Sequence, residues 1–258
     1  MSETVESRLQ DLAQHRRCAI PMDFARARGP ASEDEAYLWQ QRANRMLQDS
    51  FGPVAGLKIG CTTPVMRAFL GIDSPAAGEI FASTLHQGEA ELTHSYYRKV
   101  GVECEIAVRI GRAIEAGAPA PQPADVVASL HAAAEIVDDR YADYKALGIN
   151  WLIADNFFNA GAVIGEAITD WQGLDLTQVQ GRTLINGVEA GRGLGASVMG
   201  HPFNALDWLI RRRLASGLGI AAGTVVLLGS VVETKWLSKG DKVEIVLEGL
   251  GRLNLAVA

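Results

Sequence analysis

The spacing of apolar residues changes near residue 80, and this change restricts the chain to few folds. Between Val5 and Leu12, apolar residues recur at helical spacing. In the segment 102–110 they instead alternate with mostly polar residues, as in a strand with one buried face. Because the predicted helices and strands are segregated, we expect an α+β fold. It comprises a helical N-terminal portion (1–80) and a β-rich core (81–258), as two units or one continuous domain.

Capping signals define the helices of the N-terminal portion. Ser32 forms a capping box with Glu35 and opens a helix that runs to about Gln48. Thr63 is followed by a proline at the first helical position, and a glycine at position 71 ends this short third helix. These signals predict three helices before the strands begin.

Later elements are predicted from the same kinds of signal. Three prolines between residues 118 and 123 indicate a loop, and a helix is expected near Asp125–His131. A further helix is expected at Pro202–Arg213. The C-terminal tail predicts strands at residues 224–228, 243–247 and 253–257.

The acidic charge balance excludes one class of partner. The chain has 24 Lys and Arg against 30 Asp and Glu, a net charge of −6. Such a field repels phosphate backbones, so we expect no nucleic-acid binding. A small anionic substrate would need a local cation or a metal. Cys18, Cys61 and Cys104 have neither zinc-site spacing nor a disulfide pattern, which is typical of a reducing cytoplasm.

One uncharged stretch resembles a membrane span in length only. Leu214–Val232 carries no charge and is about long enough to cross a bilayer. It contains four glycines, however, and therefore predicts a helix end, a loop and a buried strand. The first thirty residues contain no apolar segment of the signal-peptide kind. We expect no membrane association and a cytoplasmic location.

The segment 101–108 contains the first candidate site residues. On a strand, Glu103 and Glu105 share one face while Cys104 points to the apolar side. Two carboxylates on one face repel each other, and a divalent cation would remove that conflict. By spacing alone, the ordinary alternative is a solvated strand face.

Glu135 favours the metal hypothesis. It lies in the apolar segment 132–137, and buried carboxylates are usually paired or bound to metals. Three carboxylates suit a hard cation such as Mg²⁺ or Mn²⁺. The alternatives for Glu135 are a helix end facing water or a pair with Arg140.

Lys58 is the candidate for proton transfer. It lies between Leu57 and Ile59, with a glycine on either side of the three, which predicts partial burial on a short strand. Partial burial could lower the pKa of its ammonium group and adapt it to acid–base chemistry. Alternatively, Lys58 extends to the surface, as most lone lysines do.

Two common catalytic patterns are missing from the sequence. No Gly-Xaa-Ser-Xaa-Gly motif occurs, which argues against serine-triad hydrolysis. The glycines of the segment 191–195 lack the spacing and the βαβ context of a dinucleotide-binding loop. We therefore expect no dinucleotide cofactor.

Six short motifs occur in an order that is typical of one family. They are Gly-Leu-Lys-Ile-Gly (56–60), Val-Glu-Cys-Glu-Ile-Ala (102–107), Glu-Ile-Val-Asp-Asp-Arg (135–140), Ala-Asp-Asn (154–156), Gly-His-Pro-Phe-Asn-Ala-Leu (200–206) and Leu-Gly-Ser (228–230). With them, the chain resembles the fumarylacetoacetate hydrolase superfamily from about Ser32 to its C-terminus. It looks most like the branch of 2-keto-4-pentenoate hydratases and 4-oxalocrotonate decarboxylases.

The resemblance implies a β-roll core and a metal-dependent enzyme that acts on 2-oxo acids or their enol forms. It also implies a homo-oligomer, and some pathways pair related chains as partner enzymes. It implies that Mg²⁺ or Mn²⁺ is bound by Glu103, Glu105 and Glu135, and that Lys58 lies beside the substrate as the catalytic residue.

Three further residues are predicted at the site. Ser230 and Asn156 are expected to contact the substrate, and Arg140 to orient the site. The ordinary alternatives are turn chemistry for the first two and a surface ion pair for Arg140.

The expected reaction is hydration of a 2-hydroxy-2,4-dienoate to a 4-hydroxy-2-oxo acid, in the catabolism of aromatic compounds. The chain departs from the pattern at Ala76, where many hydratases of this branch carry Asp, and at Phe157 and Phe158, where small polar residues are usual. These departures leave three alternatives open: a decarboxylase, a C–C hydrolase, or an inactive partner subunit.

Overall fold

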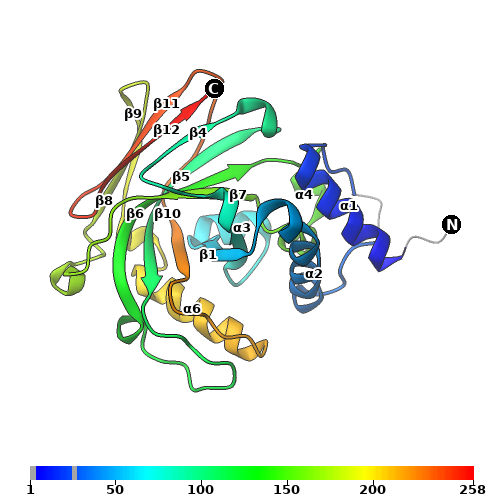
Figure 1. Ribbon diagram of the computed structural model, residues 1–258, viewed down its shortest axis with the longest axis horizontal. Helices are drawn as coiled ribbons and strands as arrows, with labels where there is room; N and C mark the ends of the chain where they lie inside the picture. Colours follow the sequence, from blue (N-terminus) through cyan, green and yellow to red (C-terminus); the bar gives the residue numbers. More distant parts are fainter. Residues whose placement is uncertain (1–3, 25–27) are drawn as a thin grey trace.

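The computed structural model describes residues 4–24 and 28–258 and combines helices with two β-sheets (Figure 1). The described α-helices are α1 Val5–Cys18, α2 Glu33–Phe51, α3 Pro64–Leu70, α4 Tyr144–Leu147, α5 Ile149–Ala154 and α6 Pro202–Ala215. The described strands are β1 Val54–Gly60, β2 Ala76–Phe81, β3 Leu85–Gln87, β4 Glu89–Leu92, β5 Val100–Ile110, β6 Val127–Asp138, β7 Asn159–Ile164, β8 Gln180–Ile185, β9 Val188–Leu194, β10 Val225–Trp236, β11 Lys242–Leu247 and β12 Gly251–Val257.

Within the described residues, the strands form a seven-stranded and a five-stranded sheet. The order in the larger sheet is β2-β1-β10-β5-β6-β7-β3, and in the smaller sheet β4-β12-β11-β8-β9. The apolar face of β5, represented by Val102 and Ile106, belongs to the same buried cluster as Val243 and Ile245 of β11. The two sheets therefore pack face to face, which buries apolar surface on both.

The other face of the larger sheet encloses a second, smaller interior. It contains small side chains, among them Ala107, Ala133 and Ala162, and also Leu227. Near opposite edges of this sheet, β2 and β7 lie in contact, so the sheet curls around this face. The fold is thus the predicted α+β roll, and its curled face carries the side chains discussed below.

The N-terminal helices pack beside the curled sheet (Figure 1). Trp39 of α2 meets Trp151 of α5 edge to face, with ring centroids 5.7 Å apart. The buried amide of Gln40 donates hydrogen bonds to the carbonyls of Ala77 in β2 (2.9 Å) and Ile153 in α5 (2.7 Å). Helix α2 thereby fixes one edge of the sheet relative to the loop that follows α5.

The predicted N-cap residues are confirmed, but the capping box at Ser32 forms only in part, because the Glu35 carboxylate accepts from the Ala31 amide. The hydroxyl of Ser32 accepts a hydrogen bond from the Glu35 amide at the start of α2. The Thr63 hydroxyl accepts one from the Met66 amide at the start of α3, and Gly71 ends that helix with a φ of 67°. The helix predicted at Pro202–Arg213 is α6, and the predicted C-terminal strands are present.

The helix predicted near Asp125–His131 is wrong. A single 3₁₀ turn, Pro123–Asp125, precedes β6, which covers the rest of that segment. Strand β6 pairs with β5 on one side and β7 on the other, and nearly all its residues are buried. A strand covered on both faces is apolar throughout, and it therefore lacks the alternation that identifies a strand in sequence.

The predicted division at residue 80 stays a prediction. Strands β1 and β2 lie before that point and pair within the same sheet as β10 and β5. Residues 1–3 and 25–27 of the predicted helical portion lie outside the described residues. The stretch Leu214–Val232 contains the end of α6, a loop and part of β10, as predicted. In the described chain, no helix combines the length and apolarity needed to cross a membrane.

Candidate active site

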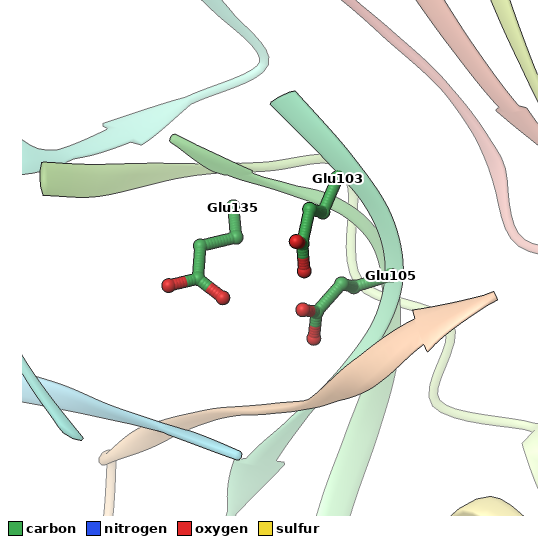
Figure 2. A group of neighbouring side chains, drawn as sticks. All are labelled: Glu103, Glu105 and Glu135. Atoms are coloured by element: carbon green, nitrogen blue, oxygen red, sulfur yellow. The ribbon is translucent and has the colours of Figure 1, made fainter. Parts of the chain in front are cut away.

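The three glutamates predicted to bind metal lie together on the curled face. Glu103 of β5 is directly opposite Glu135 of β6, and Glu105 follows two residues along β5. One carboxylate oxygen of each residue lies within 4.8 Å of those of the other two. Figure 2 shows the three carboxylates pointing into one shared space. The structure thus brings the predicted ligands together, and their binding of a metal stays a prediction.

Each carboxylate has one fixed oxygen. The Gly229 amide donates to Glu105 Oε2 (2.7 Å), and the Asn159 side chain donates to Glu135 Oε1 (3.0 Å). The Thr234 hydroxyl donates to Glu103 Oε1. Glu105 and Glu135 are fully buried, and Oε1 of the first and Oε2 of the second have no hydrogen-bond partner among the described residues. Buried carboxylate oxygens without a partner are costly, and a cation bound at the cluster would satisfy both.

The raised pKa values of Glu103 and Glu105 and the charge balance of the cluster also favour a cation there. Burial, with the charges of Glu135 and Glu103, raises the pKa of Glu105 well above its usual range. Burial and the charge of Glu135 raise the pKa of Glu103 to about 7. Nζ of Lys58 is 3.1 Å from Glu135 Oε1, and it forms the only ion pair with these carboxylates among the described residues. Three carboxylates against one ammonium group leave a deficit of positive charge, which a divalent cation fits.

Lys58 is buried on β1, as predicted, with 2% of its surface exposed. Its ammonium group lies 4.9 Å from the centre of the Phe157 ring, on the face of the aromatic system. Two glycines make room for it: a Cβ on Gly60 would lie 3.3 Å from Nζ, and a Cβ on Gly78 would lie 3.2 Å from Cε. Lys58 is therefore held between Glu135 and an aromatic ring, and not extended to the surface.

A cavity of about 510 Å³ opens beside the carboxylates. Lys58 and Glu103 line it, and so does the predicted substrate residue Ser230. The Ser230 hydroxyl donates to the carbonyl of Val232. Further polar residues that line the cavity are Thr62, Thr63, Ser197, Glu233 and Thr234. The cavity brings Glu103, the lysine and Ser230 to one hollow, which is typical of a small-molecule site.

Asn156 lies behind the cavity, outside its lining. Its side chain is fully buried, accepts from the Glu79 amide (2.7 Å) and donates to the Glu79 carbonyl (2.7 Å). The Asn44 side chain donates to the same amide oxygen (3.3 Å). These bonds join the loop after α5 to β2. A substrate contact by Asn156 stays a prediction.

Arg140 is buried and fastens the same loop. Its guanidinium group makes two bonds to Asp155 Oδ2 (3.1 and 2.8 Å) and donates to the carbonyls of Phe158 (3.4 Å) and Asn159 (3.1 Å). The Tyr141 hydroxyl also donates to Asp155 Oδ2 (2.8 Å). Arg140 therefore pairs with Asp155, and Glu135 pairs with Lys58. By holding the carbonyl of Asn159, Arg140 positions a side chain that contacts Glu135, and its orienting role stays a prediction.

Some residues of the site were missed from sequence. Asn159 and Thr234 donate to the carboxylates, and Gly229 does so through its backbone amide. Gly229 has a φ of 113° and lies where the register of β10 against β5 shifts. A Cβ there would lie 2.4 Å from the side chain of Thr62, so glycine is required. The Leu-Gly-Ser motif contained this glycine, but its partner Glu105 is 124 residues away.

The curled sheet carries a buried carboxylate cluster beside a cavity, an arrangement that suits a divalent cation and a small molecule. The family model described as fumarylacetoacetate (FAA) hydrolase, C-terminal, matches residues 79–258. The chain therefore belongs to the fumarylacetoacetate hydrolase family, which comprises enzymes. The predicted family and fold are confirmed.

Curated relatives resemble most of the chain. A 2-hydroxyhexa-2,4-dienoate hydratase of Comamonas testosteroni is 32% identical, over 86% of this chain and 85% of its own. A 2-keto-4-pentenoate hydratase of Paraburkholderia xenovorans (strain LB400) is 32% identical, over 84% of this chain and 81% of its own. A solved 4-oxalocrotonate decarboxylase from Pseudomonas putida G7, complexed with magnesium and adipate, has a TM-score of 0.87 at 21% identity, over 100% of this chain and 99% of its own. That likeness confirms the fold.

Proposed function

We propose that the chain is a divalent-metal-dependent hydratase that adds water to a 2-hydroxy-2,4-dienoate and produces a 4-hydroxy-2-oxo acid. The observation that carries this proposal is the cluster of three carboxylates, two of them with a partnerless buried oxygen, beside Lys58 in the cavity. The relatives named as hydratases, at 32% identity over most of the chain, support the reaction class.

Glu103, Glu105 and Glu135 would hold the cation, which is Mg²⁺ or Mn²⁺ in this proposal. The related decarboxylase complexed with magnesium supports a divalent ion. When bound, such an ion supplies Lewis acidity that polarises the C2 oxygen of a 2-oxo acid and stabilises negative charge there. The residues around the cluster supply the remaining chemistry.

Lys58 is the residue that moves protons in this proposal. The dienol loses its O2 proton and gains a proton at C5, which produces a C2 carbonyl conjugated with a C3=C4 double bond. Water then adds its hydroxyl to C4 and a proton to C3, so one water molecule is consumed. Lys58 lies against Glu135 and lines the cavity, where its ammonium group can donate a proton or stabilise charge at O2.

The supporting residues keep this lysine and its partner in place. Asn159 donates to the same Glu135 oxygen that Lys58 contacts, and Arg140 holds the backbone of Asn159. The Ser230 hydroxyl faces the cavity and would contact the substrate. Asn156 fixes the loop against β2 and would act by positioning. Such support keeps reacting groups within the narrow range that catalysis requires.

A second candidate keeps the site and changes the reaction. Ala76, where many related hydratases carry Asp, is fully buried at the start of β2 and offers no acid. Decarboxylation would need no water-activating group at that position, whereas C–C hydrolysis would have to activate its water with another residue. An inactive partner subunit is disfavoured because a passive chain has no use for three clustered carboxylates. The proposal also includes a cytoplasmic location, assembly into a homo-oligomer and a role in the catabolism of aromatic compounds.

An ultraviolet time course with freshly prepared 2-hydroxypenta-2,4-dienoate tests the proposal. With Mg²⁺, we expect the diene absorbance to fall and 4-hydroxy-2-oxopentanoate to accumulate, and a chelator should stop both. Glu105→Gln should abolish metal-dependent turnover, whereas Glu91→Gln, at an exposed glutamate of β4, should leave it unchanged. Release of carbon dioxide, or of a second organic acid, would favour the alternative reaction. Equal activity of both variants would contradict the metal role.

A further inference from the structure

Much of the cavity wall is hydrocarbon or aromatic. It is lined by Val137 of β6, by Phe157 and Phe158 of the loop after α5, by Tyr144 of α4, and by Met66 and Leu70 of α3. The volume of the cavity, about 510 Å³, exceeds what the carboxylate and C2 oxygen of a 2-oxo acid require. The remainder of a bound substrate would therefore contact hydrocarbon and aromatic surface.

The charged residues that line the cavity are mostly acidic. Among its described lining residues, Lys58 is the only cation, and it already pairs with Glu135. The other charged lining residues are Glu103 and Glu233. Glu233 is exposed and pairs with Lys235 (2.6 Å), which is outside the lining. Hydroxyl groups such as those of Thr63 and Ser197 also line the cavity, but none of them supplies a counter-charge. A second carboxylate at the far end of a substrate would therefore be partly desolvated without a cation, which disfavours it.

The aromatic part of this wall is held in strained backbone. Asn156, Phe157 and Phe158 have φ angles of 68°, 48° and 63°, so three consecutive residues lie in the left-handed region without a glycine. Phe158 contacts Tyr144 edge to face, with ring centroids 5.5 Å apart. Hydrogen bonds from Arg140 to the carbonyl of Phe158, and from Asn156 to β2, hold this conformation. Strain that surrounding contacts maintain is a feature of functional sites.

We infer that this site selects 2-oxo acids, or their enol forms, whose far end is an uncharged apolar chain, and rejects those that end in a second carboxylate. Phe158 and Tyr144 are the specificity-determining residues, because they line the cavity and continue a row of packed rings that starts at Phe157 beside Lys58. The inference rests on the proposed function, since it assumes that the substrate's 2-oxo acid group lies at the carboxylate cluster.

Two probes of equal carbon number test the inference without turnover. Titration calorimetry in Mg²⁺ would compare 2-oxohexanoate with 2-oxoadipate, which differs by a second carboxylate. We expect 2-oxohexanoate to bind at least about tenfold more tightly, and we expect a chelator to weaken both. Equal binding, or a preference for 2-oxoadipate, would overturn the inference while leaving the metal-dependent site intact. Failure of both probes to bind in a metal-dependent way would overturn the inference and the proposed function together.

A charge introduced at the cavity provides a second test. Met66 lines the cavity and is 45% exposed, so Met66→Arg should be tolerated and should place a cation beside the apolar wall. We expect this variant to bind 2-oxoadipate about tenfold more tightly than the unmodified chain. Ala68→Arg is the matched control, because Ala68 lies on the same helix, is exposed and is outside the lining. An equal gain in both variants would contradict the inference, since general attraction would explain it.

Discussion

Two buried ionic clusters lie on either side of the loop that follows α5, and they differ in charge balance. Around Arg140, the guanidinium group pairs with Asp155, and backbone carbonyls accept its remaining donors. Asp138 and Arg16 add one charge of each sign nearby, so the charges still balance. Around Lys58, one ammonium group faces three carboxylates. The balanced cluster fastens a loop and has a cation for its carboxylate, although Asp155 Oδ1 has no hydrogen-bond partner among the described residues. The unbalanced cluster is complete only with added positive charge, and this distinguishes a binding site from structural support.

The two clusters are also mechanically connected. Arg140 holds the backbone of Asn159, whose side chain donates to Glu135 in the unbalanced cluster. The same loop carries Phe157, whose ring lies against Lys58. The balanced cluster therefore determines where two partners of the unbalanced cluster lie. Changes in the first should act mainly on stability, and changes in the second mainly on ion binding.

The largest expected effect on stability is in the balanced cluster. Asp155→Asn keeps the shape of the side chain and leaves the buried guanidinium of Arg140 without a counter-charge. We expect the free energy of unfolding to fall by about 3–5 kcal/mol in denaturant titration. Asp207→Asn, which removes the partner of the exposed Arg211, should change the free energy of unfolding far less. Similar losses in both variants would remove the distinction between a buried and a surface pair.

The same kind of substitution in the unbalanced cluster should behave differently. Glu105→Gln removes one of three mutually repelling charges and keeps an oxygen that can accept from Gly229. In the metal-free protein we expect little loss of stability, or a gain. Saturating Mg²⁺ or Mn²⁺ should stabilise the unmodified chain by about 2.7 kcal/mol at a hundredfold excess over Kd. Calorimetric melting that shows an equal metal-induced shift in Glu105→Gln would contradict this account.

Stability should also depend on pH through Glu103. Burial and the charge of Glu135 raise its pKa from 4.5 to about 7 in the folded, metal-free protein. A raised carboxyl pKa stabilises the fold below about pH 4.5, and this contribution is lost as the pH rises through about 7. Relative to Glu103→Gln, the chelated chain should thus lose about 1 kcal/mol over that range. A parallel pH dependence of the two chains in denaturant titrations would exclude the effect.

The smallest expected effect concerns the aromatic partner of Lys58. Phe157→Leu keeps an apolar side chain and removes the ring that lies 4.9 Å from Nζ. We expect a loss of about 1 kcal/mol in the free energy of unfolding, together with a several-fold loss of turnover. In a Lys58→Met background, Phe157→Leu should lower the free energy of unfolding by less, because the ammonium group that the ring contacts is then missing. Additive losses in this double-mutant cycle would show that the ring does not interact with the ammonium group.

The sequence predicted those parts of the fold and site that local pattern determines. The alternation in β5 placed Glu103 and Glu105 on one face, and the apolar neighbours of Glu135 predicted its burial. The capping residues predicted where α2 and α3 begin. These features depend on residues within one or two turns of helix or along one strand.

The remaining parts depend on contacts between distant segments. The apolar run of β6 lacked alternation because both faces of that strand are covered, and a helix was expected in its first residues. The donors Gly229 and Asn159 reach Glu105 and Glu135 only after β10 and β7 have paired in the sheet. Their partners are 124 and 24 residues away, so no local pattern could have assigned them.

Binding of Mn²⁺ in the presence of oxalate tests the central claim most directly. Titration calorimetry would compare the unmodified chain with Glu105→Gln and with the surface control Glu91→Gln. The account predicts one Mn²⁺ per chain in the unmodified protein and the control, and a loss of at least about a hundredfold in affinity in Glu105→Gln. Equal affinity in all three chains would show that the carboxylate cluster does not hold the ion and would contradict the account.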